Sequence, residues 1–313
     1  MRMKKIFVAM LIIVVGIMGV ASYGAAYFET IAIPVAGATG GQATGVNDRG
    51  DVVGWYYTGG ATAHGYCIAD GVFSTIDYGG AASTVVNGIN NNGDFVGYYS
   101  DAEGLLHGFW YDGTYHSYDY NGENTRLTGI NDDGDLVGVY GAGDSSDPFA
   151  SFLMSGGGVT PLAYPGATST TVNDINNAGT IVGSSATWDG SHWEDYYGVL
   201  YANESFAQVE APFAGVTATS IAGINTQGDY VGTYKMDTYA TNGYVMQAGI
   251  YDTLNVPDAT STYARDINDS GMIVGGYNID GSYYGFTYSV PEPSVALLLV
   301  FGLAGLAGVR RKS

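Results

Sequence analysis

The chain has 313 residues, of which 13% are charged and 13% aromatic, with 49 Gly and 27 Tyr. Few charges and many aromatic residues argue against disorder, and this composition favours strands and tight turns. The formal net charge is −20, and residues 27–289 contain four basic residues against 29 acidic ones, a formal charge of −25. This balance argues against nucleic acid as a partner, because contacts to phosphates need Lys and Arg.

Residues 1–26 have the three parts of a secretory signal peptide. Three basic residues lie within the first five, an apolar run follows from residue 6 to about 20, and small residues come next. We therefore expect export by the Sec machinery, with cleavage after Ser22 or Ala26. The alternative is an uncleaved membrane anchor, because the run is near the lower length limit for spanning a bilayer.

One motif recurs six times and predicts the architecture. It reads roughly apolar-x-(Gly/Asp)-Ile-Asn-x-x-Gly-Asp-x-Val-Gly-x-Tyr, and successive copies are 43, 41, 45, 49 and 43 residues apart. A period of this length with several short strands per copy is typical of propeller blades. The copies centre on Asn47, Asn90, Asn131, Asn176, Asn225 and Asn268.

Each copy contains four candidate strands. The first leads into the asparagine, as in residues 84–89, and the second follows the turn, as in 94–99. Residues 108–111 are an example of the third strand, and residues 73–78 of the fourth. In the turn, the asparagine side chain is expected to bond back to the backbone, and the glycine to take the positive-φ position.

The second strand of each copy is expected to be covered on both faces. Two adjacent apolar residues point to opposite faces of the strand, so both faces must be buried, as between stacked blades. The glycine that follows them is expected to let a neighbouring backbone or ring approach closely. The tyrosine two residues later, present in five copies, is expected to pack rather than to bind.

The two ends of the repeat region complete one another. A strand of the fourth type, residues 28–33, precedes the first motif, whereas the last copy has no such strand. The N-terminal strand is therefore expected to close the ring. We predict an all-β, six-bladed β-propeller with four-stranded blades over residues 27–289, flanked by an N-terminal signal helix and a C-terminal hydrophobic helix. An open β-solenoid or two smaller β domains are the alternatives.

The repeats resemble the HAF family of extracellular repeats over roughly residues 28–289. The best matches to the namesake strand are residues 107–109 (His-Gly-Phe) and 64–66 (His-Gly-Tyr), and the histidine is absent from other copies. The resemblance implies a secreted repeat protein. It supplies no catalytic residues.

The fourth copy departs from the others and contains a candidate ligand-binding loop. It has Ser185 in place of the tyrosine, and its connection between the second and third strands is rich in aromatic and polar residues. Two Trp beside polar groups can stack on a sugar ring, and insertions on rigid scaffolds often bind ligands. The alternative is a longer loop that folds its Trp onto the blade. The candidate residues are Trp188, His192, Trp193 and Glu194.

The Asp-rich turns, such as residues 47–51 and 131–135, also suggest calcium, which takes about six to eight oxygen ligands. Their spacing does not match an EF-hand, and two copies have Thr180 or Met272 in place of the second Asp. We predict structural turns without a cofactor or metal site, with weak calcium binding as the alternative. Nucleophile, phosphate-loop and dinucleotide motifs are absent, so we predict no catalytic residues.

Residues 290–313 form a second tripartite pattern at the C-terminus. The prolines of its motif make a stiff, extended segment, and a basic end favours the cytoplasmic side of a membrane. The apolar run over 295–309 makes about 22 Å of helix, short of a ~30 Å hydrocarbon core, so it suits a transient anchor. The motif is Val290, Pro291, Glu292, Pro293 and Ser294, and the basic stop is Arg310, Arg311 and Lys312.

This tail resembles a PEP-CTERM sorting signal in the order of its motif, apolar helix and basic end. The resemblance covers about the last two dozen residues. It implies a Gram-negative bacterium that makes exopolysaccharide, as in a biofilm. It also implies processing near the motif by a membrane-embedded exosortase, after transient anchoring in the inner membrane. An ordinary C-terminal anchor with a chance Pro-Glu-Pro is the alternative.

Together these patterns predict an exported, exosortase-processed protein of the cell surface or extracellular matrix. Its expected role is structural or binding, with exopolysaccharide as the partner. The rival is a carbohydrate-active propeller enzyme, a hydrolase or a lyase, which a central cluster of acids, Arg and Tyr would favour. Only four basic residues are available to such a cluster. A third alternative is an inert matrix filler.

Overall fold

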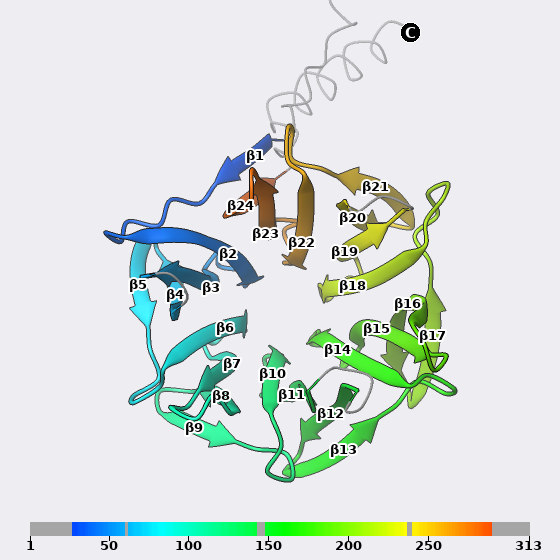
Figure 1. Ribbon diagram of the computed structural model, residues 1–313, viewed down its shortest axis with the longest axis horizontal. Coiled ribbons are helices and arrows are strands. Elements are labelled where there is room, and N and C mark those ends of the chain that lie inside the picture. Colours follow the sequence, from blue (N-terminus) through cyan, green and yellow to red (C-terminus); the bar gives the residue numbers. More distant parts are fainter. Residues whose placement is uncertain (1–26, 60–61, 143–147, 237–239, 290–313) are drawn as a thin grey trace, which may run out of the picture. The chain divides into compact units, whose positions relative to one another are not determined.

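The computed structural model describes residues 27–59, 62–142, 148–236 and 240–289. In these residues, 24 strands form six four-stranded blades around a central axis (Figure 1). The predicted six-bladed β-propeller is confirmed, and the solenoid and two-domain alternatives are wrong. The blades belong to one compact unit, Phe28–Tyr288. The predicted terminal helices, the sorting motif and the basic stop lie outside the described residues.

In blades 1 to 5 the strands follow one another in sequence from the axis to the rim, and in blade 6 the N-terminal strand takes the outermost place (Figure 1). Blades 1 to 3 consist of β2 (Ala38–Val46), β3 (Val52–Thr58), β4 (Thr62–Ala69) and β5 (Val72–Ile76); β6 (Ser83–Ile89), β7 (Phe95–Ser100), β8 (Leu106–Tyr111) and β9 (Tyr115–Tyr118); and β10 (Thr125–Ile130), β11 (Leu136–Tyr140), β12 (Ala150–Ser155) and β13 (Gly158–Leu162). Blades 4 to 6 consist of β14 (Ser169–Ile175), β15 (Ile181–Trp188), β16 (Trp193–Ala202) and β17 (Ser205–Val209); β18 (Ala218–Ile224), β19 (Tyr230–Lys235), β20 (Thr241–Gln247) and β21 (Ile250–Leu254); and β22 (Ser261–Ile267), β23 (Ile273–Ile279), β24 (Ser282–Ser289) and β1 (Tyr27–Thr30).

The N-terminal strand β1 completes the sixth blade, as predicted. It lies beside β24 as the outermost strand, and the Phe28 ring packs edge-on against Phe286 with centroids 5.1 Å apart. The Thr30 hydroxyl bonds to the Tyr277 hydroxyl at 2.8 Å. The strand is shorter than the predicted 28–33, because the chain then crosses from the sixth blade to the first (Figure 1).

The hydrophobic core lies between neighbouring blades. Val53 of blade 1, for example, belongs to one buried cluster with Val86 and Phe109 of blade 2. Within each blade, the glycine of the second strand lets the first strand approach closely, because a Cβ at Gly97 would lie 2.0 Å from the carbonyl oxygen of Val85 on the neighbouring strand. The predicted burial of both faces and the predicted close approach are confirmed. Each blade is therefore a rigid support for the residues at its ends.

Within the described ranges, no helix is long and apolar enough to cross a membrane.

Candidate functional site

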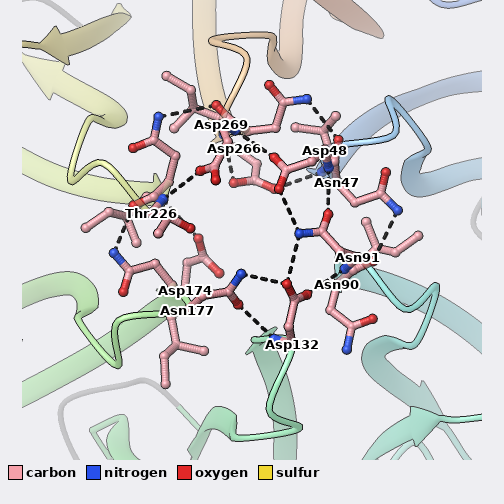
Figure 2. A pocket seen from close by; sticks show the side chains of 18 of the residues that line it. Asn47, Asp48, Asn90, Asn91, Asp132, Asp174, Asn177, Thr226, Asp266 and Asp269 are labelled. Carbon is pink, nitrogen blue, oxygen red and sulfur yellow. Dashed lines mark hydrogen bonds between the residues drawn. The ribbon is translucent and has the colours of Figure 1, made fainter.

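The six motif turns meet at one end of the central channel, where their asparagines link the blades (Figure 2). Each asparagine is buried, and its Nδ2 donates to the backbone carbonyl of the corresponding asparagine in the next blade, at 2.8–3.4 Å. The bond from Asn268 to Asn47 joins the last blade to the first, so the ring of bonds is closed. The sequence did not predict these bonds between blades.

Within each turn, the same side chain fixes the local backbone. Its Oδ1 accepts the backbone N–H four residues later, as between Asn90 and Asp94 at 2.9 Å, and this bond is present in all six turns. The motif glycines have φ between 74° and 90°, a region that favours glycine. The predicted turn chemistry is confirmed.

The residues that follow the asparagines form a second ring around the axis (Figure 2). In five of the six described pairs, the backbone N–H of one member donates to a side-chain oxygen in the next blade at 2.8 Å. The Asn91 Nδ2 lies between the carboxylates of Asp48 and Asp132, at 2.7 and 2.9 Å. These acids accept hydrogen bonds that join blades, which is the structural interpretation of the Asp-rich turns. The ring consists of Asp48, Asn91, Asp132, Asn177, Thr226 and Asp269.

Two further acids lie deeper on the axis, at motif positions where the other four copies have glycine. The Asp174 carboxylate accepts the backbone N–H of Ile224 at 3.0 Å, and that of Asp266 accepts the N–H of Val46 at 2.8 Å. Burial raises the pKa of Asp174 to about 7. Burial and the nearby Asp174 raise the pKa of Asp266. The pair therefore tends to hold a proton at neutral pH.

Beyond these two acids, away from the asparagine ring, the channel widens into a cavity of about 230 Å³. Two of the four basic residues of the propeller, Arg126 and Arg265, line it together with Tyr98. The Arg126 guanidinium lies over the rings of Tyr98 and Phe149, 5.5 and 4.9 Å from their centroids. The channel thus contains the cluster of acids, Arg and Tyr that would favour an enzyme.

The candidate ligand-binding loop of blade 4 is an extended β-hairpin. β14 pairs with β15 only as far as Ala186. The hairpin of β15 and β16 therefore extends two residues of β15 beyond the edge of β14. Trp188 and Trp193 are directly opposite each other at its end, with ring centroids 5.5 Å apart and planes at 58°. Both rings are half-buried. A single parallel bridge from Tyr196 to Ala218 ties the hairpin to blade 5.

Polar side chains occupy the tip of this hairpin. His192 lies between two acids, with its Nδ1 3.0 Å from Asp189 and its Nε2 3.7 Å from Glu194. The backbone N–H groups of His192 and Ser191 lower the pKa of Asp189 to about 2, so it stays charged. One ligand atom from each of the three residues lies within 4.8 Å of the others, a spacing that suits metal ligands, although here the two histidine nitrogens face the two carboxylates.

The structure therefore brings together all four candidate residues of the loop, Trp188, His192, Trp193 and Glu194, at the end of one hairpin. The residues around the axial cavity were missed. Two signals pointed to them: Asp replaces Gly in two copies of the motif, and arginine is rare in the propeller.

No family model and no curated protein matches this sequence. Among solved structures, a variant of the Aleuria aurantia lectin in complex with Fucα1-6GlcNAc aligns with a TM-score of 0.51 and 11% identity, over 82% of this chain and 96% of the lectin. The two chains share a fold. Another structure of that lectin, described as a six-bladed β-propeller with a novel fucose recognition mode, has a TM-score of 0.49, 11% identity, and coverage of 80% and 95%. A triple arginine-to-alanine mutant of AofleA from Arthrobotrys oligospora has a TM-score of 0.48, 12% identity, and coverage of 85% and 90%.

Proposed function

We propose that this β-propeller binds carbohydrate through the hairpin of blade 4. The observation that carries the proposal is the Trp188–Trp193 pair, whose half-buried rings stand at the end of a hairpin longer than its blade requires. Trp presents a large flat surface that suits a sugar ring, and strand pairing holds the two residues opposite each other before any ligand arrives. Such a pair needs little ordering on binding.

The polar tip supports the same function. The carboxylates of Asp189 and Glu194 and the ring of His192 are exposed beside the Trp pair, so they are available to sugar hydroxyls. An apolar platform with a few polar groups at its edge is the usual composition of a small-ligand site. The propeller lectin that shares this fold is in complex with a fucosylated sugar. We propose exopolysaccharide as the natural partner.

The test is binding of the full-length protein to the exopolysaccharide of the organism that produces it, referred to below as the host. Trp188→Ala combined with Trp193→Ala should abolish retention on the polysaccharide, because both stacking surfaces are removed. Trp110→Ala is the matched control, since Trp110 is a half-buried strand residue of blade 2, stacked on His116 at 4.6 Å. Unchanged retention of the double variant, with an unchanged unfolding temperature, would contradict the proposal.

A second candidate function is carbohydrate cleavage in the channel, favoured by the cluster of Asp174, Asp266, Arg126, Arg265 and Tyr98. Incubating the protein with the same polysaccharide separates the two functions. A hydrolase releases new reducing ends, and a lyase produces an unsaturated product that absorbs ultraviolet light. Binding without either signal supports the binding function and rejects the enzyme.

We further propose that the chain is exported by the Sec machinery, anchored transiently in the inner membrane and processed there by an exosortase, and then reaches the cell surface or extracellular matrix. The signal-peptide pattern of residues 1–26 and the PEP-CTERM-like tail of 290–313 support this proposal. Deleting residues 291–313 should leave the protein unprocessed and change its distribution between membrane and medium. Cell fractionation measures this change, and identical processing and distribution after the deletion would refute the sorting proposal.

A further inference from the structure

Arg265 enters the axial cavity from blade 6 with few partners in the protein. One terminal nitrogen donates to the Gln42 Oε1 at 3.3 Å, and the guanidinium lies 5.4 Å from the centroid of the Tyr263 ring. Its Nε is buried and has no hydrogen-bond partner among the described residues. A buried donor without an acceptor destabilises a fold, so the presence of this unpartnered nitrogen in the folded protein needs an explanation.

Arg126 faces the same cavity from blade 3, and its described contacts are the two aromatic rings beneath it. Within the described part of the chain, Arg49 forms an ion pair with a carboxylate, whereas Arg126 and Arg265 form none. The pKa of Tyr98 is raised by burial, and the positive charges of Arg126 and Arg265 partly oppose this rise. Two guanidinium groups without an ion-pair partner among the described residues and a phenol therefore line the axial cavity.

The wall of the cavity also offers acceptors. Asn87 and Asn173 donate their Nδ2 to the carbonyls of Leu127 and Ile221 in the next blade, at 2.7 and 2.6 Å. In the described part of the chain, no donor reaches the Oδ1 of either side chain, and both asparagines line the cavity. Hydroxyl groups of a ligand are suitable donors to such oxygens.

We propose that the axial cavity binds a sugar acid the size of one monosaccharide, with its carboxylate on Arg126 and Arg265 and its hydroxyls on Asn87 and Asn173. The site is separate from the Trp188–Trp193 hairpin, and the observations that support it are independent of glycan binding there. The ligand would bind the terminal nitrogens of the Arg265 guanidinium, next to the buried Nε. It would also supply the negative charge that the two arginines lack.

Size and charge favour a monocarboxylate. The cavity, about 230 Å³, is smaller than the ~300 Å³ of the smallest drug-sized pockets, so it suits one sugar ring rather than a chain of them. Guanidinium groups match the planar carboxylate with paired hydrogen bonds. A phosphate with more than one negative charge would be repelled more strongly by Asp174 and Asp266, which line the same cavity.

Calorimetric titration of the full-length protein tests the site. We expect saturable binding of D-glucuronate at pH 7, no heat with D-glucose, and weaker binding of inorganic phosphate. Absence of glucuronate binding would overturn the proposal, and so would equal binding of glucose. Tighter binding of phosphate than of glucuronate would also overturn it, because the site would then be a general anion site.

Variants locate the binding. Arg126→Gln should weaken glucuronate binding by about tenfold or more, because a charged hydrogen bond is removed. Arg265→Lys should weaken it as well, since lysine keeps the charge but loses the planar fork.

Arg49→Gln is the matched control, because it removes an arginine whose ion pair with Asp51 lies outside the cavity, and it should leave the affinity unchanged. The Trp188→Ala and Trp193→Ala double variant should also keep the full affinity for glucuronate. Failure of the hairpin function and failure of the cavity site are therefore distinguishable. Unchanged glucuronate affinity in Arg126→Gln and Arg265→Lys would overturn the proposal.

Discussion

At the scale of single residues, the motif asparagine does more than shape a turn. In the Asn90 copy, Oδ1 accepts the N–H of Asp94 within the turn, while Nδ2 donates to the carbonyl of Asn131 in the next blade. Aspartate could replace the first function but not the second, because it has no N–H to donate. The six copies therefore need an amide at this position, whereas the residue that follows varies among Asp, Asn and Thr.

Asn90→Ala should lower the free energy of unfolding by about 1–3 kcal/mol, because it leaves buried backbone groups without partners. Urea denaturation of the full-length protein measures this change. Asn92→Ala is the control, since Asn92 is exposed, its backbone N–H bond to Asn90 is kept, and the side-chain bond that is lost, to the Asp132 carbonyl, lies at the surface. We expect the control to change stability by less than about 0.5 kcal/mol. Equal effects of the two substitutions would show that the ring of bonds contributes little.

The buried acids predict a dependence of stability on pH. The folded-state pKa of Asp174 is raised to about 7 from the ordinary value of 3.8. The folded state therefore binds this proton more tightly, and the stabilisation is lost as the pH rises from about 4 through 7. Asp174→Asn does not titrate. Relative to wild type, the variant should gain roughly 2 kcal/mol in the free energy of unfolding between pH 5 and pH 8.

Denaturation of both proteins at the two pH values provides the comparison. Other carboxylates have lowered pKa values, such as that of Asp51, which the side chains of Asn47 and Arg49 lower against the effect of burial. Such groups gain most of their stabilising effect below about pH 5, and the difference between variant and wild type removes what remains of it. A difference that is constant from pH 5 to pH 8 would show that Asp174 is ionised in the folded state.

At the scale of elements, local patterns predicted what local chemistry determines. The Asn-x-x-Gly spacing predicted the hairpin turns, and the paired apolar residues before Gly97 and its equivalents predicted strands buried on both faces. The closing role of β1 followed from counting strands at the two ends. These features depend on neighbours within a few residues or on the order of elements, and both are visible in a sequence.

The hairpin of blade 4 was predictable in position but not in geometry. Its residues broke the repeat, which identified the site, yet only strand register places Trp188 opposite Trp193. The axial cavity was not predictable. Arg126 lies five residues before its motif asparagine, and Arg265 lies three residues before its own. The two arginines are 139 positions apart in the sequence and belong to different blades. Their convergence depends on the diameter of the ring.

At the scale of the whole molecule, the residues that recur in every blade and those that do not have different roles. Repeated residues close the ring, through the asparagine bonds at one end of the channel and the packing between blades. Unrepeated residues form the two proposed sites, the Trp pair of blade 4 and the two arginines of the channel. With a formal charge of −25 over residues 27–289, the molecule repels polyanions, except where its few arginines are placed.

The central claim, that the blade 4 hairpin contacts polysaccharide, is tested most directly by tryptophan fluorescence. The chain has four Trp, so a variant with Trp55→Phe and Trp110→Phe keeps only Trp188 and Trp193 as reporters. Titrating this full-length variant with the host exopolysaccharide should shift and change its emission in a saturable way, because a sugar ring replaces water on both indoles. Unchanged emission, while the protein still co-sediments with the polysaccharide, would place the binding elsewhere and contradict the claim.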